Sequence, residues 1–224
     1  MSSRTEIIEE FRSVLVGSTP VADAIIPPIV FVLFNGIAGL MTASVLAVAS
    51  GVAITVTRLF RNRPTRFALA GLAGTSVAAS LAAWSGSAEA FFVPGIISGA
   101  LTALVALISI MAGRPMVAWS SLLVRRWPGA WYWHPRVRPA YRDVTFLWMV
   151  FFATRAAVQW NLAQQGEVAQ LAAVRILGGW PALVLLLVLT YVYGSFRLKK
   201  LGGPSVDEFL TDTPAPWTGQ QRGF

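Results

Sequence analysis

The sequence predicts an all-α integral membrane protein with six transmembrane helices arranged as three helical hairpins. Hydrophobic residues make up 55% of the chain and charged residues 12%, whereas soluble domains carry about 25% charged residues. Apolar runs long enough to cross a bilayer recur along the sequence. When six spans are drawn through these runs, all but two of the 18 Lys and Arg residues fall on one side, as is typical of cytoplasmic loops.

Composition also limits the class of protein. The chain has no cysteine, so disulfides, iron–sulfur clusters and Cys-ligated zinc are excluded. Its net charge of +8 lies in the short loops between spans, where membrane topology requires it, and nucleic acid is therefore not an expected partner. The preference for arginine and alanine is typical of a GC-rich bacterial genome. We expect a bacterial inner-membrane protein with both termini in the cytoplasm.

The elements follow in order along the chain. Residues 1–19 are expected to form a cytoplasmic amphipathic segment, because Ser3 and Glu6 have the spacing of a capping box and the next apolar residues share one helical face. A transmembrane domain is expected over residues 20–200. Its six spans are predicted at Val21–Ile37, Leu40–Leu59, Phe67–Trp84, Phe91–Met111, Val144–Leu162 and Val168–Tyr193.

Turn residues and charges mark the ends of these spans. Gly36 and Gly39 indicate a tight outer turn after the first span. Residues 85–89 form an outer loop without a basic residue, and residues 164–167 form the last outer turn. The inner ends of the second, fourth and sixth spans carry basic residues, namely Arg58, Arg61, Arg63, Arg66, Arg114, Arg197, Lys199 and Lys200.

Residues 115–142 form the longest connection and mix aromatic with cationic side chains. Such a mixture is typical of the lipid headgroup layer, so we expect a cytoplasmic interfacial segment with a helix near residues 116–127 and a Pro-rich turn after it. Residues 201–224 are polar and rich in Gly and Pro, which predicts a disordered cytoplasmic tail.

Arg155 and Arg175 are the two basic residues left inside the spans. An arginine at membrane depth costs about 3 kcal/mol or more, so it normally has a partner or a task. Both lie about 10 to 12 Å from the outer ends of their spans, at 1.5 Å per residue. One interpretation is that Glu89 and Glu167, at the outer rim, form ion pairs with them. The other is that the two guanidinium groups hold an anionic phosphate or carboxylate.

Gln159, Asn161 and Asn35 lie where they can extend either network, and they complete the set of candidate ligand-binding residues. We predict no catalytic residue, no metal site and no cofactor. His134 is the only histidine, and the metal, nucleophile and phosphate-loop motifs of known enzymes are absent from the sequence.

Three segments carry a resemblance to a known group: Glu89 to Ile96 (EAFFVPGI), Arg138 to Arg142 (RPAYR) and Gly179-Trp180-Pro181. Over about residues 17–200 the chain resembles an actinobacterial family of multi-pass membrane proteins with no assigned function. That family is similar in turn to intracellular septation protein A, also called YciB. The resemblance implies an inner-membrane protein linked to envelope maintenance or cell division, and it implies no catalytic residue.

Several functions stay open at this stage. We favour a non-enzymatic envelope protein whose partners are the lipid bilayer, an anionic lipid and envelope or division proteins. A transporter or flippase for an anionic lipid or small solute predicts a cavity at the depth of the two arginines. A membrane enzyme acting on a lipid phosphate predicts a clustered acid or metal site. A scaffold predicts recruitment through the Trp-rich connection or the tail. The sequence indicates neither a substrate nor an oligomeric state.

Overall fold

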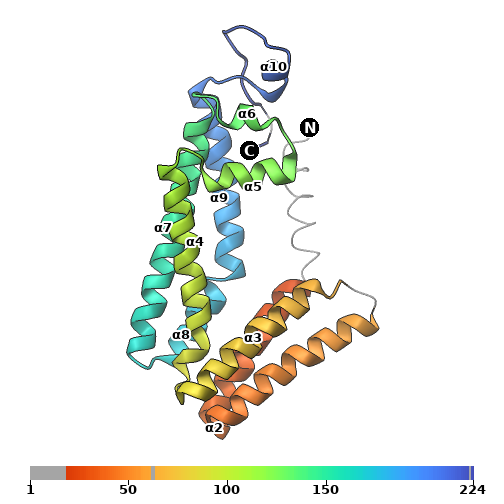
Figure 1. Cartoon of the computed structure of the whole chain (residues 1–224), viewed down its shortest axis with the longest axis vertical. Coiled ribbons are helices and arrows are strands. Elements are labelled where there is room, and N and C mark those ends of the chain that lie inside the picture. The colour runs from red at the N-terminus through yellow and green to blue at the C-terminus, as the bar shows by residue number, and fades with distance from the viewer. Residues whose placement is uncertain (1–18, 62–63, 222) are drawn as a thin grey trace. The chain divides into compact units, whose positions relative to one another are not determined.

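The computed structural model describes residues 19–61, 64–221 and 223–224, with side chains from Ile25 onward. Within this part of the chain every regular element is a helix (Figure 1). The predicted segment 1–19 falls almost wholly outside it. The described chain forms two compact units. The first contains the residues up to Gly95 together with Gln159–Ile176, and the second contains Ile96–Val158 and Leu177–Phe224.

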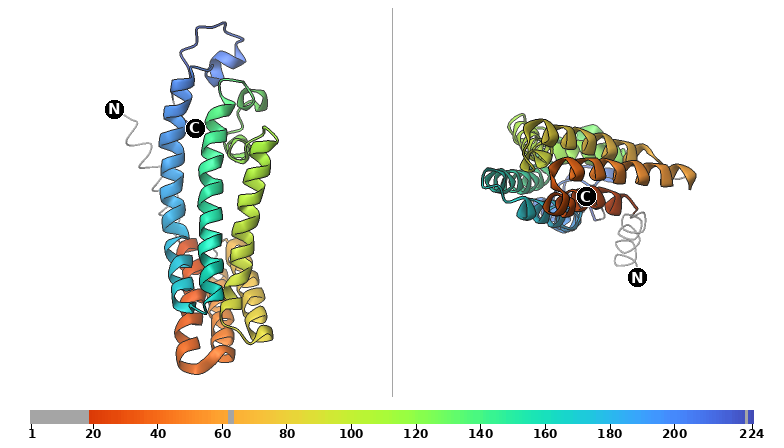
Figure 2. Two further views of the ribbon diagram at one scale, coloured as in Figure 1. Left: turned by 90° about the vertical axis from the view of Figure 1, so that its left-hand side faces the viewer. Right: turned by 90° about the horizontal axis from the view of Figure 1, so that it is seen from below.

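The first unit is built mainly from α2 (Thr19–Phe60), α3 (Arg66–Ser85), the 3-10 helix η1 (Glu89–Phe92) and α8 (Val168–Leu177). Helix α2 is interrupted at Gly39, whose φ of 80° and ψ of 169° are not helical. Figure 2 shows the chain reversing its direction within α2. Such a positive φ costs little only for glycine, and the predicted outer turn coincides with this residue.

Small side chains hold α2 and α3 together. Ala43, Ala47 and Gly51 follow one another at four-residue spacing on α2 and are all buried. A Cβ at Gly51 would lie 3.1 Å from Cδ1 of Leu72 on α3. Residues without bulk let two helices approach closely in lipid, where packing replaces the hydrophobic effect as the driving force.

The second unit contains most of α4 (Val93–Met111), then α5 (Met116–Arg125), α6 (Gly129–Tyr132), most of α7 (Arg138–Gln164), α9 (Trp180–Leu201) and α10 (Val206–Leu210). Helices α4, α7 and α9 run side by side, and α5 lies across one end of them (Figures 1 and 2). Helix α5 confirms the helix predicted near residues 116–127.

Four helical segments of the described chain are long and apolar enough to cross a membrane: Ile25–Phe60, Arg66–Ser85, Glu89–Met111 and Val168–Leu201. The chain is therefore a membrane-embedded protein. Helix α7 is not among the four, because it carries more polar residues. Six spans remain a prediction.

The sixth predicted span, Val168–Tyr193, falls within the apolar segment Val168–Leu201, but this segment is not one continuous helix. The chain forms two helices, α8 and α9, with Gly178 and Gly179 between them. Gly179 has φ −84° and ψ −125°, outside the helical region, and Pro181 follows in the first turn of α9. Two glycines lower the cost of leaving the helix, and a proline ring fits a first turn but not a helix interior.

Residues 201–224, for which a disordered tail is predicted, contain a short helix and tertiary contacts in the part described. Ser205 and Glu208 form a capping box that starts α10. One oxygen of Glu208 also accepts hydrogen bonds from the backbone N–H (2.7 Å) and the hydroxyl (2.6 Å) of Thr218. The ring of Phe224 stacks on Tyr141, with 4.4 Å between centroids. The polar composition of the segment reveals neither the hydrogen bonds from Thr218 to Glu208 nor the packing of Phe224 on Tyr141.

Tyr141 and Phe224 belong to the aromatic core of the second unit. Trp131, Tyr132 and Tyr141 are almost fully buried and contact one another edge to face. The indole N–H of Trp131 donates to the carbonyl of Pro204 at 2.9 Å, and the hydroxyl of Tyr132 lies 3.1 Å from that of Ser121. Burial raises the pKa of Tyr132 and of Tyr141. Some of the aromatic residues of the connection 115–142, which is expected to lie in the headgroup layer, are thus part of the protein core.

Candidate functional site

The two intramembrane arginines belong to different units. Arg155 lies on α7 in the second unit, is half-buried, and has a buried Nε without a hydrogen-bond partner. Among the described residues, no carboxylate forms an ion pair with it. Arg175 lies on α8 in the first unit. A shared site for Arg155 and Arg175 therefore stays a prediction.

Arg175 has an aromatic environment. Its guanidinium carbon lies 5.8 Å from the ring centroid of Phe91 and 5.8 Å from that of Phe92. Phe91 in turn stacks on Phe31 at 4.0 Å. A cation over a desolvated aromatic face gains about 1 to 2 kcal/mol. The sequence suggested an ion pair or an anionic ligand for Arg175, and neither interpretation included a contact with these rings.

The remaining predicted site residues make local contacts. Glu89 accepts a hydrogen bond from Ser87 at 2.5 Å, and Glu167 accepts one from Gln170 at 3.1 Å. Asn161 accepts one from Gln165 at 2.6 Å. Gln159 is buried and Asn35 is half-buried.

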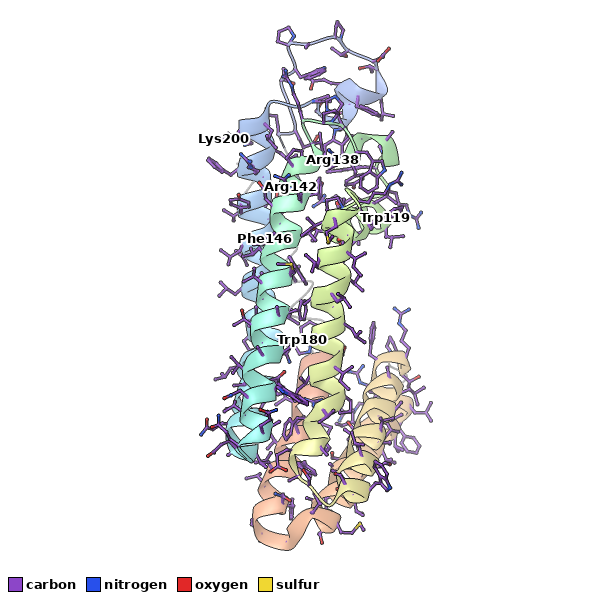
Figure 3. The ribbon with its side chains drawn as sticks, turned by 60° about the vertical axis from the view of Figure 1, so that its left-hand side comes forward. Trp119, Arg138, Arg142, Phe146, Trp180 and Lys200 are labelled. Atoms are coloured by element: carbon purple, nitrogen blue, oxygen red, sulfur yellow. The ribbon has the colours of Figure 1, made fainter. Side chains whose placement is uncertain are left out.

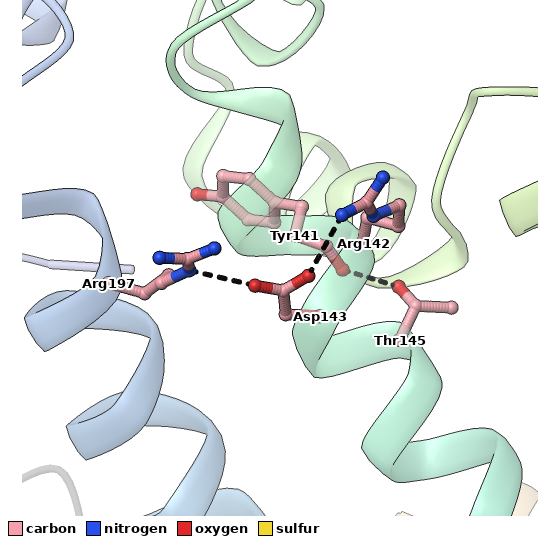
Figure 4. A network of polar contacts seen from close by, with 5 residues as sticks. All are labelled: Tyr141, Arg142, Asp143, Thr145 and Arg197. Atoms are coloured by element: carbon pink, nitrogen blue, oxygen red, sulfur yellow. Dashed lines mark hydrogen bonds and ion pairs between the residues drawn. The ribbon is translucent and has the colours of Figure 1, made fainter. Parts of the chain in front are cut away.

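Asp143, near the N-terminal end of α7, forms ion pairs with Arg197 and Arg142 (Figure 4). Nε of Arg197, from α9, donates to Asp143 at 2.8 Å, and Arg142 lies 3.5 Å from the other carboxylate oxygen. The side chain of Arg142 is 57% exposed, against 20% for Asp143. Asp143 accepts its short hydrogen bond from Arg197 and lies farther from Arg142. The guanidinium of Arg142 therefore retains much of its capacity to bind an anion.

A groove begins at this ion-pair cluster. It has a volume of about 580 Å³, within the range of sites that hold small ligands. The wall is mostly apolar and comes from α4, α7 and α9, while charged side chains stand at one end. The lining residues are Ile110, Arg142, Asp143, Phe146, Leu147, Val150 and Tyr193.

A smaller pocket of about 150 Å³ adjoins this groove and shares Ile110 and Arg142 with it. Its other lining residues are Gly113, Pro115, Arg138 and Pro139. Gly113 has a φ of +69°, and a Cβ at this position would lie 3.6 Å from Nη1 of Arg138. The small pocket is therefore bordered by two arginines at the N-terminal end of α7, where the helix dipole also favours an anion.

One stripe on α7 joins the two cavities. Arg138, Arg142, Phe146 and Val150 are spaced four residues apart and so lie on one helical face. Figure 3 shows Arg138, Arg142 and Phe146 following one another along α7. Sequence reasoning assigned the two arginines to the headgroup layer as part of residues 115–142 and missed this site, although the four-residue spacing was visible.

The arrangement of charge and apolar surface matches an amphiphile. Paired guanidinium groups bind phosphate or carboxylate oxygens through charge-assisted hydrogen bonds, and an acyl chain fits a trough of aliphatic and aromatic side chains. Asp143 is held between Arg197 and Arg142, so its role in this site is to position arginine side chains. In the part of the chain that the structure describes, no group of three or more potential metal ligands is found.

Comparison with known proteins identifies the family. The family model described as "Protein of unknown function (DUF3159)" matches residues 15–197, which is most of the chain, and the chain therefore belongs to this family. No curated protein and no solved structure matches the chain. The expected uncharacterised membrane family is thus supported, and the likeness to septation protein A stays a prediction.

Proposed function

We propose that this member of the family is a six-span protein of the bacterial inner membrane, with cytoplasmic termini, that binds an anionic amphiphile in the groove of the second unit. The supporting observation is that two neighbouring cavities share Ile110 and Arg142 in their linings, with exposed arginine at one end and apolar walls at the other. The function is binding in support of the cell envelope, and no catalytic residue is assigned.

The anionic group would occupy the small pocket between Arg138 and Arg142, and the hydrocarbon chain would follow Phe146, Leu147 and Val150. Arginine suits this task because its planar fork can bind two oxygens of one phosphate. Asp143 and Arg197 stabilise the mouth of the groove through the 2.8 Å bond, which leaves an excess of positive charge there.

The sidedness follows from the same residues. Basic residues accumulate at the end of the second unit that contains the mouth, and positive charge in short loops is typical of the cytoplasmic side. This places the anionic group of the ligand at the level of the inner-leaflet head groups. The residues are Arg114, Arg125, Arg126, Arg136, Arg138, Arg142, Arg197, Lys199 and Lys200.

Native mass spectrometry with lipid analysis tests this proposal on protein purified in mild detergent. We expect the wild type to retain phosphatidylglycerol or another anionic lipid, and the double variant Arg138→Gln with Arg142→Gln to lose it. The matched control is Lys199→Gln with Lys200→Gln, which removes two exposed cations of α9 outside the lining of the groove. Equal lipid occupancy in all three proteins would contradict the groove site.

A second double variant separates the groove from the site first expected from the sequence. Arg155→Gln with Arg175→Gln should leave the bound lipid in place if the groove holds it. Loss of the lipid in this variant alone would move the site to the intramembrane arginines. Val150→Trp offers an independent check, because the larger side chain should occupy part of the apolar groove without changing its charge.

Translocation of the same amphiphile is a second candidate function. Two apolar segments, Ile25–Phe60 and Val168–Leu201, are each interrupted by glycine, at Gly39 and at Gly178 and Gly179. Interrupted helices are common at the substrate sites of transporters. Liposomes carrying fluorescent phosphatidylglycerol and a membrane-impermeant quencher provide the test. Faster loss of inner-leaflet fluorescence than in protein-free liposomes would support translocation, and an unchanged rate would limit the function to binding.

A further inference from the structure

Helix α5 has apolar side chains that the described part of the chain leaves exposed. Leu123 is 74% exposed and Val124 is 82% exposed, and Trp119 on the preceding turn is also exposed. Val117 and Ala118, on the first turn of α5, are instead buried in the aromatic core. Trp119 and Leu123 are four residues apart and therefore neighbour each other on one side of the helix, and Val124 adds to the exposed apolar surface at the C-terminal end of α5.

The orientation of this surface is fixed by hydrogen bonds. The first backbone N–H groups of a helix have no partner inside the helix. In α5, Met116 N–H donates to the hydroxyl of Ser109 on α4 at 2.9 Å, and Val117 N–H donates to the hydroxyl of Thr145 on α7 at 3.2 Å. The start of α5 is thereby attached to two long helices, and α5 lies across their ends (Figure 1).

Cationic side chains border the apolar surface. Trp119 packs against Trp133 with 5.4 Å between ring centroids, and the guanidinium of Arg114 lies 5.2 Å from the Trp133 ring. Arg126, directly after α5, is exposed. Tryptophan at the boundary of the hydrocarbon and arginine beside it match the headgroup layer of a membrane with anionic lipids.

The depth of α5 in the membrane follows from the short connection between the end of α4 and the start of α5. The apolar segment Glu89–Met111 is long and apolar enough to cross a membrane, and α5 begins at Met116. The connection is also compact, because Arg114 N–H donates to the carbonyl of Ser109 at 2.9 Å. Helix α5 therefore starts where the span leaves the hydrocarbon.

We propose that α5 is an in-plane membrane anchor, whose Trp119, Leu123 and Val124 insert below the anionic head groups while Arg114 and Arg126 bind lipid phosphate. A bilayer is the occupant because the surface continues from a membrane span and carries positive charge at its border. The anchor does not depend on the groove, so either can fail without the other. The role of the anchor is to hold α5 in the plane of the membrane.

Site-directed spin labelling in nanodiscs tests the anchor on the full chain. The native chain has no cysteine, so Leu123→Cys introduces a unique labelling site at a side chain that is 74% exposed. Collision of the nitroxide with oxygen reports hydrocarbon, and collision with a charged nickel chelate reports water. Two further labels provide references: Leu104→Cys on the exposed side of α4 and Thr211→Cys on an exposed turn after α10.

In nanodiscs with phosphatidylglycerol we expect the label at position 123 to resemble the one at position 104, with more oxygen than nickel collisions. Accessibility to nickel equal to that at position 211 would show a water-exposed helix and overturn the proposal. Low collision rates with both reagents would show that protein covers the surface, which also overturns it. Replacing Arg114 and Arg126 by Gln should raise nickel accessibility at position 123, and no change would refute the role of the arginines.

Discussion

The docking of the C-terminal segment depends on one glycine in α9. A Cβ at Gly194 would lie 2.5 Å from three atoms of the Phe224 ring, closer than real contacts allow. The ring is held by stacking on Tyr141 at 4.4 Å and by the bond from Arg125 Nε to the Phe224 carbonyl at 2.9 Å. We therefore predict that Gly194→Ala expels Phe224 and loosens the segment after Gly202.

The size of the effect follows from two opposing contributions. Phe224 is 8% exposed, and burial of a phenylalanine side chain stabilises by about 1.5 to 3 kcal/mol. Alanine favours a helix over glycine by about 1 kcal/mol, so α9 itself should not be weakened. The docked segment should lose about 2 kcal/mol, and since 1.4 kcal/mol is a factor of about ten, its opening should become at least about tenfold more frequent.

Hydrogen exchange measured by mass spectrometry resolves this prediction. Exchange should rise at the backbone N–H groups of Val206, Thr218 and Gly219, which are bonded within the segment, and stay unchanged in α9. Phe224→Ala should give the same pattern. Gly74→Ala is the matched control, since nothing lies within 4 Å of its added Cβ. Unchanged exchange of the segment in Gly194→Ala would refute the reasoning.

Three further predictions concern stability. Gly51→Ala should change the free energy of unfolding by less than about 1 kcal/mol, because the gain in helix propensity is offset by the contact of 3.1 Å between the added Cβ and Cδ1 of Leu72, the end of a flexible side chain. Thr190→Val should cost about 1 to 3 kcal/mol in chemical unfolding, because it removes the acceptor of the 2.8 Å bond from Trp148. Hydrogen bonds from Thr218 and Ser205 lower the pKa of Glu208 from 4.5 to about 2; its stabilising contribution is therefore present above pH 4.5 and is lost as the pH falls through about 2, which exchange measured against pH should show.

Controls accompany these predictions. Gly71→Ala adds a Cβ that contacts nothing within 4 Å, and it should melt no lower than the wild type. Thr102→Val removes a hydroxyl bonded only to its own helix, and it should cost much less than Thr190→Val. Glu208→Gln should open the segment already at neutral pH; a segment that stays protected in this variant would contradict the role of the carboxylate.

Much of the fold was predictable because its signals are local. Hydropathy over about twenty residues sets the position of a membrane helix, and the predicted third and fourth spans differ from α3 and α4 by only one or two residues. The break at Gly39 and the helix α5 were likewise visible as a turn signal and as an aromatic and cationic connection. Each of these features depends on neighbours in the sequence.

The sequence by itself determined the class of this protein, a membrane-embedded all-helical chain, together with most helix positions. Tertiary structure alone decided that Phe224 stacks on Tyr141 and that Arg175 lies over Phe91. It also decided that α4, α7 and α9 enclose a groove beside Arg142. The physical reason is that a cavity or a stacked pair depends on surfaces far apart in the chain, whereas hydropathy, helix breaks and capping are set within a few turns of each residue.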